Sequence, residues 1–240
     1  MSRRFHLAVL LLICTTACAS QKQTVQTPVR GQEYQLVEGG LGEELRRQLG
    51  PDRLALVEKL NRADVAHLRR LPVLVIPTSG DDELRHSPLP LTYGWAGGFP
   101  KAIVVHLPSQ VFGAYERGSL VRWGPISSGS PKAPTPSGLF ELTWKSRGHR
   151  SSVDPDWFMR WYFNFDRKQG LAFHQHPLPG RPASHACLRL LDRDAKWIFD
   201  WGEPGTPVLI LGQYDFGAPP PWLSLDWLGQ GVKLPEEISR

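Results

Sequence analysis

The spacing of hydrophobic positions divides the chain into two folded units. In the first unit, a strand-like run begins at Tyr34, and leucines recur every four residues from Leu41 to Leu49. A second apolar run with helical spacing follows, and the apolar segment 71–77 ends the unit. Spacing of three to four residues is typical of helices, whereas a short apolar run bounded by turn residues is typical of a strand. The order strand, helix, helix, strand predicts a small α+β module over residues 34–77.

The second unit, residues 101–213, has the short alternating runs of a β-rich domain. In residues 138–145, apolar and polar side chains alternate, as in a strand with one buried face. One helix is predicted between Asp192, a candidate N-cap, and Gly202. The other predicted strands cover residues 102–107, 111–115, 119–126, 171–176 and 206–211. Short strands separated by turns predict a mainly β fold, a sandwich or barrel with a short helix.

The segments outside these units lack hydrophobic periodicity. Residues 20–33 are polar and predict a linker. Residues 78–100 are rich in Pro, Gly and Ser and predict a second linker or a loop that wraps the domain. The tail, residues 214–240, is too rich in Pro and Gly for a regular element, and we expect its tryptophans to pack against the domain.

Residues 1–19 have the layout of an export signal. Two arginines precede an apolar run that is too short to span a membrane, and small residues surround Cys18. Residues 15–18 resemble a bacterial lipobox, in which Cys18 would be lipid-modified and would anchor the chain to a membrane. Ordinary cleavage at an A-x-A site formed by residues 17–19 is the alternative. Both interpretations predict an exported protein of the periplasm or cell envelope.

Composition excludes several classes of protein. Hydrophobic residues make up 41% of the chain and charged residues 21%, which excludes a disordered chain and a coiled coil. The net charge is +5, but the basic residues are dispersed among acidic ones and form no run, so we predict no nucleic-acid partner. An anionic polymer such as cell wall remains compatible with this charge.

Candidate chemistry is concentrated between residues 171 and 191. This segment holds three of the eight histidines, His174, His176 and His185, together with Cys187. Cys187 is the one cysteine outside the export signal, so it has no disulfide partner in the mature chain. Imidazole can lower a thiol pKa and transfer its proton, which suits Cys-His acyl transfer. The same four residues could also bind zinc, so the sequence leaves a metal site as an alternative.

A six-residue motif at this thiol resembles the S-H-G-C-x-R signature of bacterial L,D-transpeptidases with a YkuD-type catalytic domain: Ser184-His185-Ala186-Cys187-Leu188-Arg189. Two upstream motifs resemble the family's T-P-x-G-x-F and S-x-G elements: Thr135-Pro136-Ser137-Gly138-Leu139-Phe140 and Ser127-Ser128-Gly129. The resemblance covers residues 101–212 and implies an L,D-transpeptidase-like β-sandwich. Ala186 stands where the family has Gly, and it would be strained if that position needs positive φ.

The resemblance implies a reaction on peptidoglycan without a metal or organic cofactor. Cys187 would attack a tetrapeptide stem, release D-Ala and form a thioester that an amine then attacks. His174 would donate and accept protons, with His176 and His185 as alternatives, and His185 would also support the site. The residues expected to bind substrate are Arg189, Ser184, His176 and Trp161, with Trp157 as an alternative to Trp161. A hydrolytic relative and a non-catalytic glycan-binding envelope lipoprotein remain alternatives.

Residues 34–77 resemble a LysM module, which binds glycans that contain N-acetylglucosamine. The resemblance rests on the order of elements and on Asn61 after the second helix, although Gly39-Gly40-Leu41 replaces the usual Gly-Asp-Thr. The partners implied are peptidoglycan glycan strands; a packing module without glycan affinity is the alternative. The other histidines outside the export signal have no partners at useful spacing and are predicted to be structural or surface residues: His67, His86, His106 and His149.

Overall fold

The protein is described here by a computed structural model covering residues 33–78, 82–151, 154, 156–236 and 238. The predicted export signal, including Cys18, and almost all of the first linker lie outside the described residues. Among the residues described, no helix is long and apolar enough to cross a membrane.

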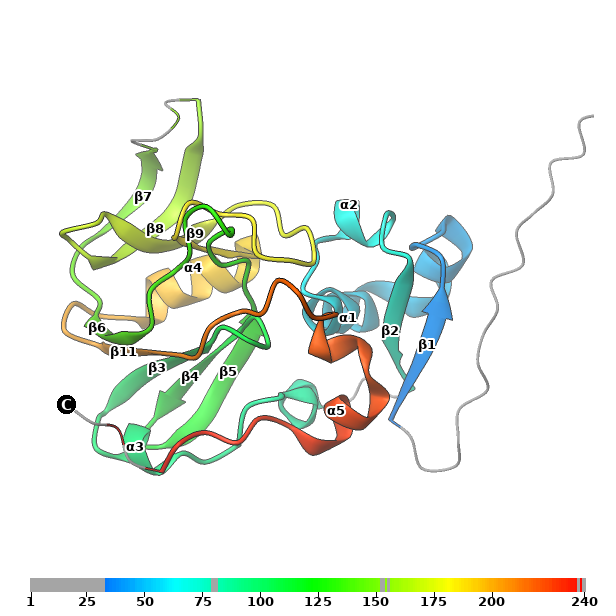
Figure 1. Ribbon diagram of the computed structural model, residues 1–240, viewed down its shortest axis with the longest axis horizontal. Helices are drawn as coiled ribbons and strands as arrows, with labels where there is room; N and C mark the ends of the chain where they lie inside the picture. The colour runs from blue at the N-terminus through cyan, green and yellow to red at the C-terminus, as the bar shows by residue number, and fades with distance from the viewer. Residues whose placement is uncertain (1–32, 79–81, 152–153, 155, 237, 239–240) are drawn as a thin grey trace, which may run out of the picture.

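Two β-sheets form a sandwich, which confirms the mainly β fold (Figure 1). The five-stranded sheet has the order β5-β4-β3-β11-β6, and the four-stranded sheet has the order β10-β9-β8-β7. The strands of the first sheet are β3 Lys101–His106, β4 Val111–Glu116, β5 Ser119–Pro125, β6 Gly138–Glu141 and β11 Pro207–Leu211. Those of the second are β7 Lys145–Arg150, β8 Phe158–Asp166, β9 Leu171–Gln175 and β10 Leu188–Leu190.

The main core lies between the two sheets. Side chains of the first sheet such as Ile103 and Phe112 meet Phe163 and Phe173 of the second, and all four are fully buried. Helix α4, Asp192–Trp201, adds Ile198 to this core and packs against β8 and β9. Gly202 follows the helix as predicted, but Leu191 rather than Asp192 is the N-cap residue.

The N-terminal module contains the predicted two strands and two helical segments, together with one short helix that was not predicted. Strands β1, Tyr34–Glu38, and β2, Val73–Pro77, pair antiparallel, and helices α1, Glu43–Asn61, and α2, Val65–Leu68, lie between them in sequence. Gly50 has φ +67° and breaks α1 into two helical segments, which correspond to the two predicted helices.

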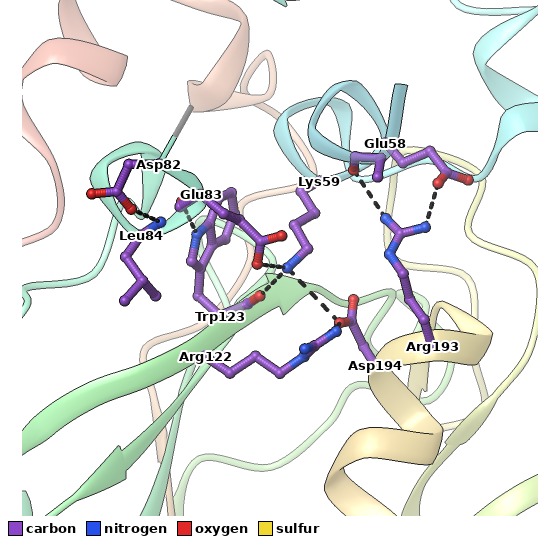
Figure 2. Close-up of polar contacts among 10 residues, drawn as sticks. Glu58, Lys59, Asp82, Glu83, Leu84, Arg122, Trp123, Arg193 and Asp194 are labelled. Atoms are coloured by element: carbon purple, nitrogen blue, oxygen red, sulfur yellow. Dashed lines mark hydrogen bonds and ion pairs between the residues drawn. The ribbon is translucent and has the colours of Figure 1, made fainter. Parts of the chain in front are cut away.

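A buried polar network joins this module to the sandwich (Figure 2). The ammonium of Lys59, on α1, is fully buried, pairs with Glu83 and Asp194, and donates to the carbonyl of Trp123 at 2.6 Å. Asp194, on α4, also binds the guanidinium of Arg122 at 2.7 Å. Because both charged groups at the centre of the network are withdrawn from water, the module is held against the domain by compensated charges.

Residues 82–100, the described part of the predicted second linker after Thr78, wrap the domain. They form the 3-10 helix η1, Glu83–His86, and the single-turn helix α3, Gly94–Gly97. Tyr93 and Ala96 enter a second core on the outer face of the five-stranded sheet. This wrapping is one of the two alternatives that the sequence left open.

The tail contains regular structure that the sequence analysis did not predict. It forms the 3-10 helix η2, Pro221–Leu223, and helix α5, Leu225–Gln230. Ser224 caps α5 by accepting a hydrogen bond from the amide of Trp227, so a short helix forms despite the nearby prolines. Trp222 is 1% exposed and its ring lies 5.1 Å from the Arg62 guanidinium. The tail tryptophans thus pack against the rest of the protein, but Trp222 and Trp227 contact Arg62 of the module, whereas the catalytic domain was predicted as their partner.

Candidate active site

The Cys187 thiol lies at the end of a tight turn that leads into β10. Ala186, directly before it, has φ +75°, so the turn imposes the left-handed conformation that disfavours a Cβ atom. Ser184 Oγ donates to the carbonyl of Cys187 at 2.5 Å. Thr135 Oγ1 donates to the carbonyl of Ala186 at 2.8 Å. Side chains on both sides therefore hold the turn in its strained form.

The three motifs that are separated in sequence meet at this turn. Ser127 and Arg189 exchange two backbone hydrogen bonds, at 3.0 and 3.1 Å. The carbonyl of Ser128 accepts from the amide of Ser184 at 3.0 Å, and the amide of Gly129 donates to Thr135 Oγ1 at 2.9 Å. The S-x-G and T-P-S-G elements thus form the support on which the thiol-bearing segment rests.

His174 reaches the site from the neighbouring strand. Strands β9 and β10 pair in parallel, with His174 opposite Arg189. The side chain of His174 is buried, and its Nδ1 lies 3.0 Å from the carbonyl oxygen of Gln175. A carbonyl only accepts, so Nδ1 carries the proton and Nε2 has a free lone pair. Burial lowers the pKa of His174 to about 4, which keeps the imidazole neutral and able to accept a proton at neutral pH.

The thiol itself is held in its protonated form. Burial raises the pKa of Cys187, and this effect outweighs a backbone hydrogen bond from Ala172 and the charge of Arg189, which lower it. The nearest recorded acceptor is the carbonyl of Gly170, 3.9 Å from Sγ. A protonated thiol is a weak nucleophile, so the site needs a base to remove its proton, and neutral imidazole is such a base.

A cavity of about 200 Å³ brings the chemistry-bearing residues together. Six of the seven predicted catalytic and substrate-binding residues line it, and Trp161 is the exception: Cys187, His174, His176, His185, Arg189 and Ser184. None of the described lining residues is acidic, and no described carboxylate pairs with the Arg189 guanidinium. The cavity is therefore suited to an anionic ligand.

Trp157 forms one wall of the cavity. Its ring centroid lies 5.7 Å from that of His176 and 5.3 Å from that of His185, and the Arg189 guanidinium lies 5.8 Å from the same ring. Nδ1 of His176 is buried without a hydrogen-bond partner among the described residues. Burial lowers the pKa of His176 to about 4, so this ring is also neutral at neutral pH.

The prediction that Trp161 lines the site is wrong. Trp161 has φ +56°, which interrupts the alternation of β8 and turns its side chain to the opposite face of the sheet. There its Nε1 donates to Asp192 at 3.0 Å, and its ring lies 5.6 Å from that of Phe199 on α4. Trp157, the alternative, occupies the cavity wall instead.

His149 lines the cavity, whereas the sequence analysis predicted a structural or surface residue at this position. Its ring centroid lies 4.4 Å from that of Tyr162, whose hydroxyl donates to the Gly170 carbonyl at 3.1 Å. Both side chains come from the antiparallel pair of β7 and β8. Strand alternation from Trp157 would place Tyr162 on the opposite face, so the local pattern contains no signal for it. The remaining three histidines lie outside this cavity and have polar partners that the sequence analysis did not find: His67 with Asp64, His86 with Tyr34 and His106 with Ser109.

The zinc alternative is not supported by the geometry. Across the described residues, no three or more His, Cys, Asp or Glu side chains are grouped so that they could hold a metal ion. His174 donates through Nδ1 to a backbone carbonyl, and His185 packs against Trp157. The four residues line one cavity but do not converge as a ligand set.

Comparison with known proteins gives one family match and several similar structures. Comparison with curated proteins finds no match. An L,D-transpeptidase from Stackebrandtia nassauensis is 22% identical with a TM-score of 0.45, over 48% of this chain and 57% of that chain. Mycobacterium tuberculosis L,D-transpeptidase 1 is 25% identical with a TM-score of 0.40, over 47% and 63% of the two chains. An L,D-transpeptidase from Mycobacterium smegmatis is 17% identical with a TM-score of 0.43, over 80% and 100%. This chain thus covers less than two thirds of the first two structures. Residues 100–210, which carry Cys187 and its supporting motifs, match the YkuD family, described as the L,D-transpeptidase catalytic domain.

Proposed function

We propose that this protein is a cysteine L,D-transpeptidase that acts on peptidoglycan stem peptides. The observation that carries the proposal is the placement of Cys187, His174 and Arg189 around one cavity whose described lining residues include no acidic side chain. A thiol, a base and a carboxylate-binding group are the three parts that acyl transfer from an anionic peptide needs. The match of this segment to the L,D-transpeptidase catalytic domain supports the same conclusion.

The reaction follows from the protonation states. Nε2 of His174 accepts the thiol proton as Cys187 Sγ attacks the carbonyl carbon that precedes the terminal D-Ala of a tetrapeptide stem. The C–N bond breaks, His174 returns the proton to the leaving D-Ala amine, and a thioester remains. An acceptor amine then attacks the thioester and restores the thiol. The Arg189 guanidinium binds a substrate carboxylate, since a guanidinium can bind a carboxylate through two hydrogen bonds.

The proposal also includes the cellular setting expected from the sequence. The export signal and the lipobox-like residues 15–18 support a lipid-anchored protein of the cell envelope. The LysM-like order of elements in residues 34–77 supports a role of the module in binding glycan strands.

Mass spectrometry of disaccharide-tetrapeptide fragments tests the activity. The wild-type chain should yield a product that has lost D-Ala and gained a second stem, and it should pass through a thioester adduct on the Cys187 peptide. Cys187→Ala should give neither species, and chelator should change neither. D-Ala release without a joined product would show a hydrolase, and glycan binding without turnover would show a non-catalytic envelope protein.

A further inference from the structure

The loop between His176 and Ser184 is held by the N-terminal module. The amide of Leu178 donates to Asp64 Oδ2 at 2.8 Å, and the carbonyl of Leu178 accepts from the amide of Asp64 at 3.0 Å. Next along the loop, the amide of Gly180 donates to the carbonyl of Arg62 at 3.1 Å. Among the described residues, the backbone of residues 177–180 makes no other hydrogen bond, so the module alone holds this part of the loop through hydrogen bonds.

This loop joins the two halves of the catalytic cavity. His176, which lines the cavity, directly precedes it, and the turn that carries Cys187 follows it. At its far end, Ser127 Oγ donates to the carbonyl of Arg181 at 2.8 Å. The amide of His176 donates to the carbonyl of Leu190 at 3.3 Å, so the sandwich holds both ends of this segment and the module holds its middle, between His176 and the turn at Cys187.

The two carboxylate oxygens of Asp64 bind different segments of the chain. Its Oδ1 accepts from the amide of His67 at 3.0 Å as the N-cap of α2 and also lies 2.8 Å from His67 Nδ1. Its Oδ2 is left for Leu178. One carboxylate thus ties the start of a module helix to the active-site loop, and both of its oxygens are in use.

We propose that Asp64 is a positioning residue for the catalytic site, acting through its hydrogen bond to the amide of Leu178. This inference rests on the proposed function and adds to it that the module is a structural part of the active site. Preorganised groups accelerate a reaction only while their geometry is held, and a displacement of about 1 Å can cost 10²-fold in rate. The module thereby holds the middle of the segment that connects His176 to the strained turn at Cys187.

Steady-state transpeptidation by full-length variants tests the role of the hydrogen bond. Asp64→Ala should lower kcat about tenfold or more and leave KM for the donor stem within about twofold. Asp64→Asn loses the charge but keeps an oxygen that can accept from Leu178, and it should retain most of kcat. Gly180→Ala approaches the loop from the other side: Gly180 has φ +77°, and an added Cβ would lie 3.2 Å from Leu71 Cδ2 of the module. It should reproduce the loss seen in Asp64→Ala.

Two control variants separate positioning from general destabilisation. Asp82→Ala removes a comparable N-cap, since Asp82 accepts from the amide of Leu84 at 3.0 Å, but it does not touch the loop. His67→Ala removes the other partner of Asp64 and leaves the carboxylate. Both should keep kcat at the wild-type value. Two results would overturn the proposal. One is that the activity lost in Asp64→Ala is fully explained by a smaller folded fraction in thermal melts. The other is that Asp64→Asn loses as much activity as Asp64→Ala.

An activity-independent measurement keeps the test valid if the proposed function fails. The rate at which iodoacetamide alkylates Cys187 can be followed on its peptide by mass spectrometry at a series of pH values. In Asp64→Ala, the pH of half-maximal rate (the alkylation midpoint) should shift toward that of an exposed thiol. In Asp82→Ala it should stay at the wild-type value. An unchanged midpoint in a folded Asp64→Ala variant would show that the hydrogen bond from Leu178 to Asp64 does not affect the environment of the Cys187 thiol. If the wild type shows no transpeptidation but the alkylation midpoint still shifts in Asp64→Ala, only the proposed reaction is contradicted and the role of Asp64 stands.

Discussion

Thr135 Oγ1 donates to the carbonyl of Ala186 at 2.8 Å and accepts from the amide of Gly129 at 2.9 Å. Thr135 is 49 residues or more from the thiol-bearing motif in sequence, but it is the side chain that holds the left-handed residue before Cys187. The strain of that residue is offset by a specific hydrogen bond, so the turn and the Thr135 segment act as one unit.

Thr135→Val should separate this hydrogen bond from packing, because Val has nearly the same shape and no hydroxyl. We expect a loss of about 1–3 kcal/mol in the free energy of unfolding, since the amide of Gly129 and the carbonyl of Ala186 both lose a partner. We also expect a lower kcat per folded molecule. Thr206→Val is the matched control, because Thr206 Oγ1 accepts from Glu203 far from the thiol and the variant should keep kcat. Equal kcat in the two variants would contradict the role of Thr135.

Ala186→Gly should relieve the strain at the turn. The left-handed conformation costs an L-residue about 1–2 kcal/mol, and the greater freedom of unfolded Gly offsets about 0.5–1 kcal/mol of the gain. The net expectation is an increase of about 0.5–1 kcal/mol in unfolding free energy, measured by urea denaturation. A decrease would show that the Ala186 methyl group contributes packing that outweighs the strain.

Trp157, which directly precedes β8, and Trp161 within β8 should respond differently to truncation. Trp157→Ala removes a cavity wall and should raise KM for the donor stem more than it lowers stability. Trp161→Ala removes a hydrogen bond to Asp192 and packing against Phe199, so it should lower the melting temperature and leave KM unchanged. Steady-state kinetics and thermal melts of both variants decide the matter, and an increase in KM for Trp161→Ala would contradict the placement of its side chain.

Buried neutral histidine should make stability depend on pH below neutrality. The pKa of His174 falls from its ordinary value of 6.5 to about 4 on folding, so between these values the unfolded chain binds more protons. This contribution is fully present above pH 6.5 and is lost as the pH falls toward 4. The stability difference between wild type and His174→Gln should change by about 1 kcal/mol per pH unit in this window. Urea unfolding at pH 7, 6 and 5 measures it, and a constant difference would refute the assignment.

The buried cation of the module interface should be far more important to stability than an exposed one. Lys59→Met leaves Asp194 buried with only Arg122 as a partner and should cost about 3–5 kcal/mol of unfolding free energy. Lys196→Met removes a pair with Asp200 in which both side chains are more than half exposed, and it should cost less than about 0.5 kcal/mol. Similar losses in the two variants would show that the network in Figure 2 adds little to the attachment of the module.

Short-range patterns predicted most of the strands and the location of the chemistry. Short apolar runs and turn residues identified β3, β4, β5, β9 and β11, because their side chains pack in the buried cores. The charged strand β7 and the three-residue strand β10 were missed, since neither has an apolar run long enough to detect. Strand β8 was also missed, because apolar side chains occupy both of its faces and hide the alternation. The expected strand over residues 138–145 ends at Glu141, where the chain crosses from one sheet to the other.

Residue order alone was sufficient to group Cys187 with its three neighbouring histidines, because strand alternation and motif spacing are local properties. Only the tertiary structure placed Trp157 rather than Trp161 in the cavity, since a single positive φ reverses the face of β8. It also brought His149 to the cavity and Asp64 to the loop at Leu178, across 114 residues of chain. Such contacts depend on how sheets and modules pack together, and packing is decided by the whole set of buried surfaces rather than by any segment.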